Sequence, residues 1–418
     1  MKQILFTFFV LSLLITISKG QWSEQTSGVT TTLYSVSAVN DDVAWACGAS
    51  GRVLMTTNGG TNWTSVVTPN ATLNLYHIYG ASASIALVTG STTNTFVYRT
   101  TDGGSTWSQV FTQTGGFIDA IVQRGLNPQH FIMMGDPVGG RWSIWLSTDN
   151  GATWDSTGIY LPQAGSEAGW NNSMAATADV AFRFWFGTSN TRVYYKAPGP
   201  TFIFQTQPTT GLANSSAIWF NDNAKGMVGG TSMQYTTNSG ANWSPITTSG
   251  TGDISGITGA GSDWWYVRGT GIYYSSNNGL IWSTDYTAPS GSHQHISKSR
   301  TGNVMWAVRT AGGIAKSLGP IGIEPISSEI PKSYSLYQNF PNPFNPSTTI
   351  RFDISKESFV KITVFDETGR EVSRLVNENL RAGKYEIHWA ASMHASGMYF
   401  YKLESAGFVE TKKMVLIK

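Results

Sequence analysis

The chain has 418 residues, and its 27 Lys and Arg against 25 Asp and Glu give a formal net charge of +2. Only 12% of the residues are charged and no stretch concentrates Lys and Arg, which argues against nucleic acid as a partner because no basic face is expected. The single cysteine, Cys47, excludes an internal disulfide and is interpreted as a small buried residue rather than a reactive thiol.

Residues 1–20 have the pattern of a secretory signal peptide. Lys2 precedes an apolar run over residues 4–17, and Ser18 and Gly20 are the small residues expected before a cleavage site. The run is too short to span a bilayer and no other segment is apolar enough to do so. The mature chain is therefore expected to begin near Gln21 and to contain no transmembrane segment.

A motif of the form Ser/Thr-x-Asp/Asn-x-Gly-x-x-Trp occurs five times between residues 56 and 282, and each copy follows a strand-like segment. Its Asp or Asn, Gly and Trp positions are Asn58, Gly60 and Trp63; Asp102, Gly104 and Trp107; Asp149, Gly151 and Trp154; Asn238, Gly240 and Trp243; and Asn277, Gly279 and Trp282. Asp, Asn and Gly form turns, and a Trp that follows a turn can pack between sheets, so each copy predicts a structural turn between two strands.

The spacing of these motifs indicates a propeller. With a decayed copy at residues 199–202, successive closing aromatic residues are 44, 47, 48, 41 and 39 residues apart, the length of a four-stranded blade. Residues 22–25 resemble a strand that follows a motif, and residues 313–317 resemble one that precedes it. Together they predict a seventh blade, so residues 21–318 are expected to form a closed, seven-bladed β-propeller. An open solenoid of the same repeats is the alternative.

The five motifs resemble the Asp-box (BNR) repeats of sialidase-like and photosystem-assembly-factor-like propellers. Such repeats occur in enzymes and in non-enzymes, so the resemblance implies an architecture rather than an activity.

Residues 319–333 contain Pro320, Pro325 and Pro331 and are expected to form a linker. Residues 334–418 contain short alternating strand patterns between turn signals, which predict a small immunoglobulin-like β-sandwich. The fold class is therefore all-β throughout.

The last module carries a second resemblance. The strings at 337–350, 364–372, 382–385, 396–399 and 411–417 are similar to the C-terminal sorting domain of type IX (Por) secretion substrates. This resemblance implies that residues 334–418 engage the type IX machinery of a Bacteroidetes- or Chlorobi-type bacterium, which places the protein outside the cell or on its surface. An ordinary carbohydrate-binding or immunoglobulin-like sandwich is the alternative.

A ligand is expected on one face of the propeller. The motifs join the third and fourth strands of a blade, so they share a face with the turn between the first and second strands, and a functional site is expected on the opposite face. The charged residues assigned to that opposite face are Asp119, Asp136, Arg141, Glu167, Asp253, Arg268 and Arg309. The strings around Asp136, Arg141 and Glu167 also resemble loops of sialidase-like propellers of undefined activity. An Asp136–Arg141 pair that only holds a loop is the alternative.

Two function classes remain open. A glycoside hydrolase needs two facing carboxylates, about 5 Å apart for retention or about 6.5–9.5 Å for inversion. Two of Asp119, Asp136, Glu167 and Asp253 could supply them, with Glu167 and Asp136 as the named pair, but nothing in their spacing requires a pair. Sialidases also carry an Arg-Ile-Pro string, which this chain lacks. The preferred hypothesis is a secreted or cell-surface binding protein for a glycan or a surface protein, with a hydrolase as the alternative.

Other chemistry has weaker support in the sequence. His293 and His295 lack a clustered third ligand, so neither a metal site nor a cofactor is expected. Trp142, Trp145 and the Trp264-Trp265 pair stand at strand spacing and are predicted to be blade core rather than sugar platforms.

Overall fold

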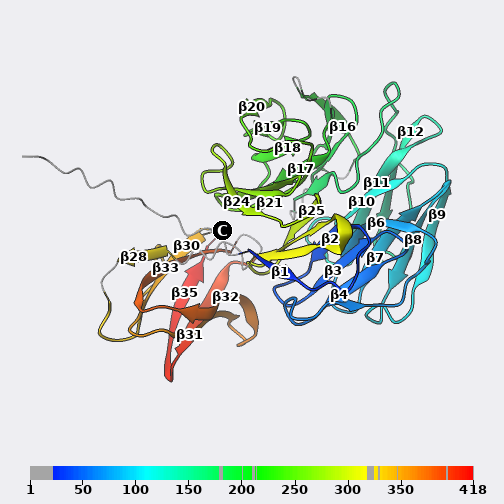
Figure 1. The fold of residues 1–418 in the computed structure, drawn as a ribbon. Helices are drawn as coiled ribbons and strands as arrows, with labels where there is room; N and C mark the ends of the chain where they lie inside the picture. The colour runs from blue at the N-terminus through cyan, green and yellow to red at the C-terminus, as the bar shows by residue number, and fades with distance from the viewer. Residues whose placement is uncertain are drawn as a thin grey trace, which may run out of the picture.

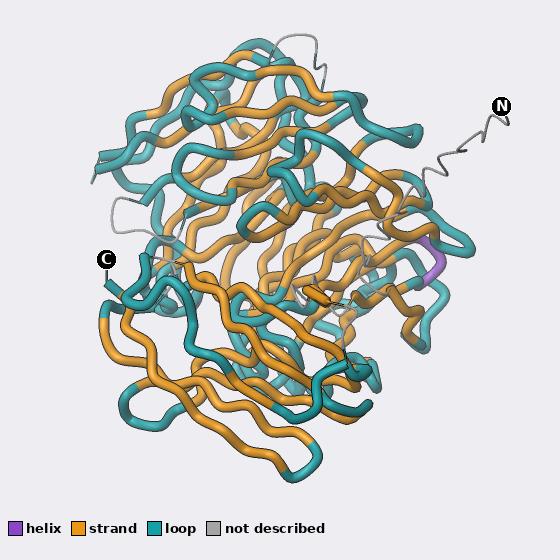
Figure 2. The backbone as a smooth tube through the Cα atoms, turned by 90° about the vertical axis from the view of Figure 1, so that its left-hand side faces the viewer, coloured by secondary structure: helices purple, strands orange, loops and turns teal. Residues whose placement is uncertain are grey.

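The computed structural model describes residues 22–177, 182–199, 201–209, 212, 214–317, 324–327, 330–345, 347–391 and 394–417. Seven antiparallel sheets between Trp22 and Ser317 form a ring, and two sheets from later residues form a sandwich (Figure 1). Strands and loops make up almost all of the described chain, with one 3-10 turn, η1 (Thr310–Gly312) (Figure 2). The predicted all-β fold, a propeller followed by a small sandwich, is confirmed.

Each blade runs outward from an inner strand. The inner strands are β2 (Leu33–Ala38), β6 (Asn74–Gly80), β10 (Ile118–Gln123), β13 (Met174–Ala176), β17 (Ala217–Phe220), β21 (Ile254–Ala260) and β25 (His293–Lys298). The second strands are β3 (Ala44–Gly48), β7 (Ala86–Ser91), β11 (Phe131–Val138), β14 (Phe184–Gly187), β18 (Gly226–Gly229), β22 (Asp263–Arg268) and β26 (Met305–Arg309). The third strands are β4 (Val53–Thr56), β8 (Asn94–Thr100), β12 (Arg141–Ser147), β15 (Arg192–Lys196), β19 (Met233–Thr236), β23 (Gly271–Ser275) and β27 (Ile314–Ser317).

The outer strands are less regular. They are β5 (Thr64–Ser65), β9 (Ser108–Thr114), β16 (Phe204–Pro208), β20 (Ser244–Ile246), β24 (Ser283–Thr287) and, for the last blade, β1 (Trp22–Gln25). The third blade is a three-stranded sheet, β10-β11-β12, in which isolated bridges from Asp155 and Pro162 to β12 stand where an outer strand would lie. Each inner strand contacts the inner strands of both neighbouring blades, from β2 to β25 and back to β2, so the ring is closed.

The last blade contains strands from both ends of the propeller, as predicted. β1 pairs antiparallel with β27, with Trp22 opposite Ser317 and Gln25 opposite Ile314. The Trp22 side chain is 8% exposed, and its Nε1 donates to Asp285 Oδ2 of the preceding blade at 2.7 Å. The N-terminal strand is thus held by its own sheet and by the neighbouring blade.

The five motifs form one repeated turn. In each, the Gly N–H donates at 2.8–3.0 Å to the hydroxyl of the Ser or Thr that opens the motif, and this hydroxyl donates to the Asp or Asn Oδ1 at 2.7–3.1 Å. The motif glycines have φ between 76° and 89°, and an added Cβ would meet the preceding blade within 2.0–2.8 Å. Glycine is therefore required both for the backbone conformation and for the close approach of the preceding sheet.

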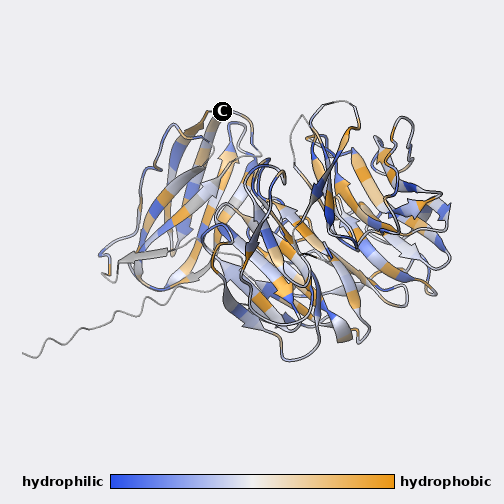
Figure 3. Cartoon of the chain, turned by 90° about the horizontal axis from the view of Figure 1, so that it is seen from above, coloured by the Kyte–Doolittle hydropathy of each residue, from blue (hydrophilic) through white to orange (hydrophobic). Residues whose placement is uncertain are grey.

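The predicted core residues lie in the core. Trp142, Trp264 and Trp265 are at most 2% exposed, and Trp145 packs edge-on against Phe111. Cys47 is fully buried, and burial raises the pKa of its thiol. Apolar residues concentrate along the strands of both domains (Figure 3). The side chains of these tryptophans and of Cys47 therefore serve in core packing.

The sandwich has two four-stranded sheets. One has the order β28 (Glu324–Ser327), β33 (Gly383–Ala390), β30 (Ser347–Ile354), β29 (Ser335–Leu336), and the other β32 (Glu371–Leu380), β31 (Ser358–Asp366), β34 (Gly397–Ser405), β35 (Phe408–Leu416). The buried core between them is built from residues 336–416, separate from the clusters of the propeller.

Part of the expected linker, residues 319–333, belongs to the sandwich. Glu324 and Pro325 pair with β33, so the range contains an edge strand of the sandwich. Pro325 does not prevent this pairing, because an edge strand tolerates Pro. The expected linker therefore extended too far. The predicted signal peptide, residues 1–20, lies outside the described residues.

The proline-rich string of the tail covers a sheet edge. The Phe344 N–H donates to Val415 O and the Ile417 N–H to Phe344 O, each at 2.9 Å, so this string lies along β35. Gln338 Nε2 donates to Lys413 O at 2.8 Å on the same strand. The string therefore protects an edge that would otherwise be open to pairing with another chain.

Candidate functional site

The two faces of the ring are defined by the motifs. In all five, a backbone N–H of the motif donates at 2.9–3.0 Å to a carbonyl in the first turn of the same blade, for example Gly59 to Asp42. We call this side the box face. The inner strands begin on the opposite face, where the candidate ligand residues were placed.

Two of the candidate arginines on the opposite face are loop anchors. Arg268 is 6% exposed, and its guanidinium donates to the carbonyls of Ser249 (3.5 Å) and Gly250 (3.3 Å), among others, in the loop before β21. Arg309 is 4% exposed; it donates to Ser290 O at 2.8 Å and forms an ion pair with Glu24 of β1. Their predicted role as ligand contacts does not fit this burial, although Arg309 Nη1 has no hydrogen-bond partner among the described residues.

Glu167 is also an internal residue. It is 1% exposed, and its Oε1 accepts hydrogen bonds from Tyr194 OH (2.6 Å), Trp142 Nε1 (3.2 Å) and the Ala164 N–H (2.9 Å). Its Oε2 lies 3.3 Å from Arg192 Nε. These groups come from two neighbouring blades and from the long loop between them, so Glu167 holds that loop in place. Its expected roles as a ligand contact and as a proton donor do not fit this burial.

Asp119 and Asp136 meet around one glycine. Asp136 Oδ1 accepts the Gly169 N–H at 2.7 Å, and a Cβ on Gly169 would lie 2.0 Å from Asp119 Oδ2. Burial, reinforced by the charge of Asp136, raises the pKa of Asp119 well above its usual value; burial also raises that of Asp136, against the Gly169 hydrogen bond. Asp119 is 2% exposed, so of this pair only the half-buried Asp136 is open to a ligand.

The remaining charged candidates lie apart. Arg141 Nη2 donates to Ser156 Oγ at 3.1 Å, and among the described residues no ion pair joins Arg141 to Asp136. The alternative of a loop-holding Asp136–Arg141 pair therefore fails as well. Asp253 is exposed on another blade. The seven candidates consequently do not form one charged cluster.

His293 is buried and His295 is half-buried, and a ring nitrogen of each lies near a backbone carbonyl. Burial lowers the pKa of His293 to about 4 and that of His295 to about 3. His293 Nδ1 lies 3.1 Å from Gly269 O, and His295 Nδ1 lies 3.1 Å from Val36 O. Within the described ranges no group of three or more His, Cys, Asp or Glu side chains is placed to hold a metal ion.

A regular feature of the opposite face was missed by the sequence interpretation. Five inner strands carry a β-bulge at their second or third residue, which leaves that residue unpaired with the second strand. The bulged residues are Tyr34, Tyr76, Asp119, Ser255 and Gln294. The signal was present in the sequence. The buried residues on either side of each bulge are three positions apart, as Leu33 and Val36 are. In an unbroken strand, residues on one face recur at every second position.

Three aromatic residues at these strand starts form a ladder. The rings of Tyr34 and Tyr76 are stacked with centroids 5.1 Å apart, and the rings of Tyr76 and Phe117 are tilted with centroids 4.8 Å apart. All three side chains are partly exposed. We call Tyr34, Tyr76 and Phe117 the aromatic ladder; it spans the first three blades on the opposite face.

The segment that enters the fourth blade crosses to the ladder. Asn172 has a φ of 64°, and its Oδ1 accepts from Ser35 Oγ at 2.8 Å and lies 2.7 Å from His77 Nδ1. Its backbone N–H donates to Asp119 O at 3.0 Å. One residue thus ties the fourth blade to the first three, which fixes the strand starts that carry the ladder.

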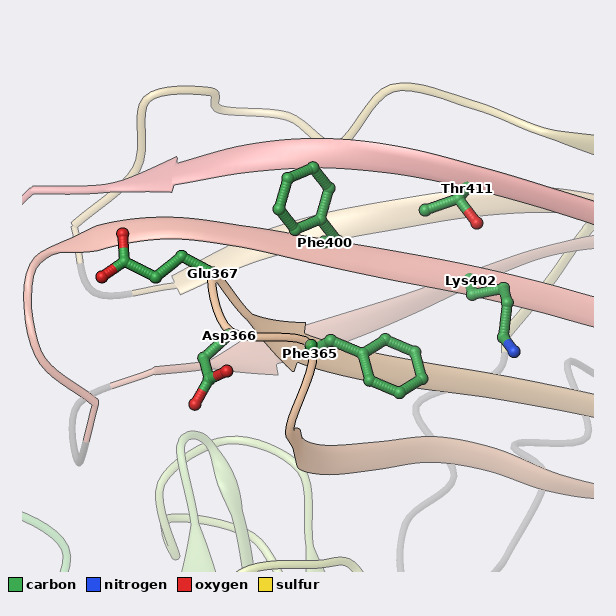
Figure 4. A pocket seen from close by; sticks show the side chains of 7 residues that line it. Phe365, Asp366, Glu367, Phe400, Lys402 and Thr411 are labelled. Atoms are coloured by element: carbon green, nitrogen blue, oxygen red, sulfur yellow. The ribbon is translucent and has the colours of Figure 1, made fainter.

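The sandwich carries a small surface pocket of its own (Figure 4). Its volume is about 240 Å³, and Phe365 and Phe400 lie beside Asp366, Glu367 and Lys402 around it. Asp366 Oδ2 accepts from Arg370 Nε at 3.0 Å, so part of its charge is already paired. The pocket lies on the outer face of the tail, and none of its lining residues belongs to the aromatic ladder.

The comparisons with known proteins identify the tail. Residues 338–418 match the family model of the secretion system C-terminal sorting domain. Such a domain indicates export by the type IX route to the cell surface or beyond it. In the described part of the chain, no helix is long and apolar enough to span a membrane.

The remaining comparisons concern the propeller. The structure of YCF48 bound to D1 peptide is similar, with a TM-score of 0.56 and 16% identity over 72% of this chain and 98% of that one. YCF48 from Cyanidioschyzon merolae gives a TM-score of 0.54 and 17% identity over 71% of this chain and 98% of that one. At this identity the likeness shows the fold alone. No curated protein sequence matches the chain significantly.

Replacing Glu167 tests its structural role. Glu167→Gln should destabilise the protein by about 1–3 kcal/mol, because the new amide brings a donor towards Arg192 and removes the ion pair; Arg192 is 25% exposed, which limits the loss. Asp253→Asn makes the same chemical change at an exposed position and should change stability by less than about 0.5 kcal/mol. Urea unfolding of both variants measures the difference, and equal stability would refute the anchor role.

Proposed function

We propose that the protein is an exported, non-catalytic binding protein that uses the opposite face of its propeller to contact a ligand. The observation that carries this proposal is the burial of the Glu167 side chain. The hydrolase alternative needs a proton donor that reaches the substrate, and a carboxyl that is 1% exposed and surrounded by three hydrogen-bond donors and Arg192 does not do so.

Two further points support a binding role. The arginines that would hold a substrate carboxylate, Arg268 and Arg309, are buried in contacts with their own chain. A protein of similar fold, YCF48, has been seen with a D1 peptide, so this architecture serves as a binding module there.

Hydrolysis assays test the proposal. The mature chain, residues 21–418, should release no chromophore from a panel of chromogenic glycosides that includes a sialoside, a β-glucoside and a β-galactoside. The matched control is the Asp136→Asn variant, which should give the same background because Asp136 has no catalytic partner. Turnover by the parent chain that is lost in Asp136→Asn would replace the binding role with the hydrolase.

A further inference from the structure

The two outer faces of the sandwich differ in polarity. On the sheet that contains β30 and β33, an ion pair lies on the outer face, with Arg351 Nε 3.0 Å from Glu386 Oε2. The sheet that contains β31, β34 and β35 carries a group of apolar side chains at one end of its outer face. We call this group the outer patch; its members, all exposed or half-buried and all outside the core cluster of the sandwich, are Phe365, Met398, Phe400 and Val415.

The strand register brings the outer patch together. Phe365 stands opposite Phe400 across β31 and β34, and Met398 stands opposite Val415 across β34 and β35. Met398 and Phe400 are two residues apart on β34, and side chains at that spacing share a face of the sheet. The residues that alternate with them, such as Tyr399 and Tyr401, are buried in the core. The outer patch is therefore one continuous surface over three neighbouring strands.

The pocket of the tail opens at this patch. Phe365 and Phe400 line it, with Lys402 and Thr411 at one end and Asp366 and Glu367 at the other (Figure 4). Its volume of about 240 Å³ has room for one large side chain.

The charges around the pocket favour an apolar occupant. Lys402 Nζ lies 3.1 Å from Glu404 Oε1 and 5.5 Å from the centre of the Phe365 ring, so this ammonium group already has partners. The Asp366 carboxylate is paired with Arg370. An ion would have to compete with these contacts, whereas an apolar or aromatic side chain needs only the two phenyl rings.

The sorting role of the tail requires a surface that a partner can contact. Residues 338–418 match a secretion sorting domain, and the machinery that exports such a chain has to contact this domain. The backbone edge of β35 is not free for that purpose, because Gln338 and Phe344 cover it. A contiguous exposed apolar surface with a pocket is the usual mark of a protein–protein contact.

We infer that the outer patch is the surface by which the export machinery holds this protein, and that a large apolar or aromatic side chain of a partner protein enters the pocket beside Phe365 and Phe400. The inference concerns the tail and does not depend on the binding role proposed for the propeller.

Export of the full chain from a host with a type IX system tests the surface. Phe400→Ala should lower the ratio of exported to periplasmic protein about tenfold, because a ring at the centre of a protein contact contributes at least that factor to affinity. Phe400→Leu keeps an apolar side chain and should retain most of the export. Immunoblots of the medium, the cell surface and the periplasm measure the ratio.

Two control variants should be exported like the parent. Phe359→Ala removes an exposed phenyl ring from the other end of β31, and Arg351→Ala breaks the ion pair on the other outer face. Thermal melting of each purified variant reports whether it is folded. If Phe400→Ala is unfolded, the exposed Met398 decides, and Met398→Ser should lower export in the same direction.

Several results would overturn the inference. Parental export of a folded Phe400→Ala chain is one, and parental export of Met398→Ser where Phe400→Ala is unfolded is another. An equal loss in Phe359→Ala would show that the patch is not selective. Light scattering that finds a dimer of the mature chain, converted to a monomer by Phe400→Ala, would make the patch a contact between copies. Co-sedimentation with phosphatidylethanolamine vesicles that Phe400→Ala abolishes would make it a lipid contact.

Discussion

Deleting Trp22–Gln25 from the mature chain should lower the free energy of unfolding by more than about 3–5 kcal/mol, the cost of truncating one buried Trp alone. The deletion removes all of β1, so β27 loses its partner and becomes an exposed edge. It also removes Trp22 from its contact with Asp285 in the preceding blade.

The same deletion leaves a buried charge without its partner. Arg309 is 4% exposed and pairs with Glu24, and hydrogen bonds from Arg309 and Tyr286 lower the pKa of Glu24, although burial alone would raise it. Removing one member of such a pair leaves the other uncompensated inside the protein. This loss adds to that of Trp22.

Urea unfolding compares the deletion with two point variants. Trp22→Ala should account for much of the loss, whereas Ser23→Ala, at an exposed position of the same strand, should shift stability by less than about 0.5 kcal/mol. If the deletion is no more harmful than Ser23→Ala, the pairing of β1 with β27 does not hold the ring together in solution.

The ring was predictable because its signals are local and repeated. A hydroxyl, a carboxylate or amide, and a glycine within five residues determine each turn, as Thr100, Asp102 and Gly104 do. The two half-units at the ends, residues 22–25 and 313–317, complement each other as strand patterns. Such information is contained in short segments, so it can be found without knowing which blades touch.

The candidate site was less predictable because its contacts are not local. The face of each charged residue followed from its place in the repeat, but its partners did not. Glu167 is bound by Trp142 and Tyr194, which lie 25 and 27 residues away on different blades. Arg309 is bound to Glu24, which is 285 residues away. Whether a charge faces solvent or its own chain therefore depends on packing that spacing does not reveal.

The ladder could have been found from the sequence, and the reason is physical. A strand with one face buried places apolar residues at every second position, and a bulge adds one residue. Ile118 and Ile121, or Ile254 and Ile257, are both buried at a spacing of three. The same irregularity at equivalent places in several repeats indicates a bulge near the start of each of these strands.

Deleting residues 319–418 should abolish release from the cell and leave the propeller folded. The match to a secretion sorting domain gives the tail its role, and its hydrophobic core contains no residue of the propeller. In a host with a type IX system, the truncated protein should accumulate in the periplasm. Its urea midpoint should remain that of the propeller in the full chain, because the cores are separate.

The position of the cut matters for this experiment. Removing only residues 334–418 would leave β28 behind without β33, its partner in the sandwich, and would expose an unpaired strand. Immunoblots of the periplasm and the medium therefore compare both truncations with the parent and with a reporter that carries residues 319–418 behind a signal peptide. The reporter should leave the cell. Appearance of the 319–418 deletion in the medium at parental levels would show that export does not depend on the tail.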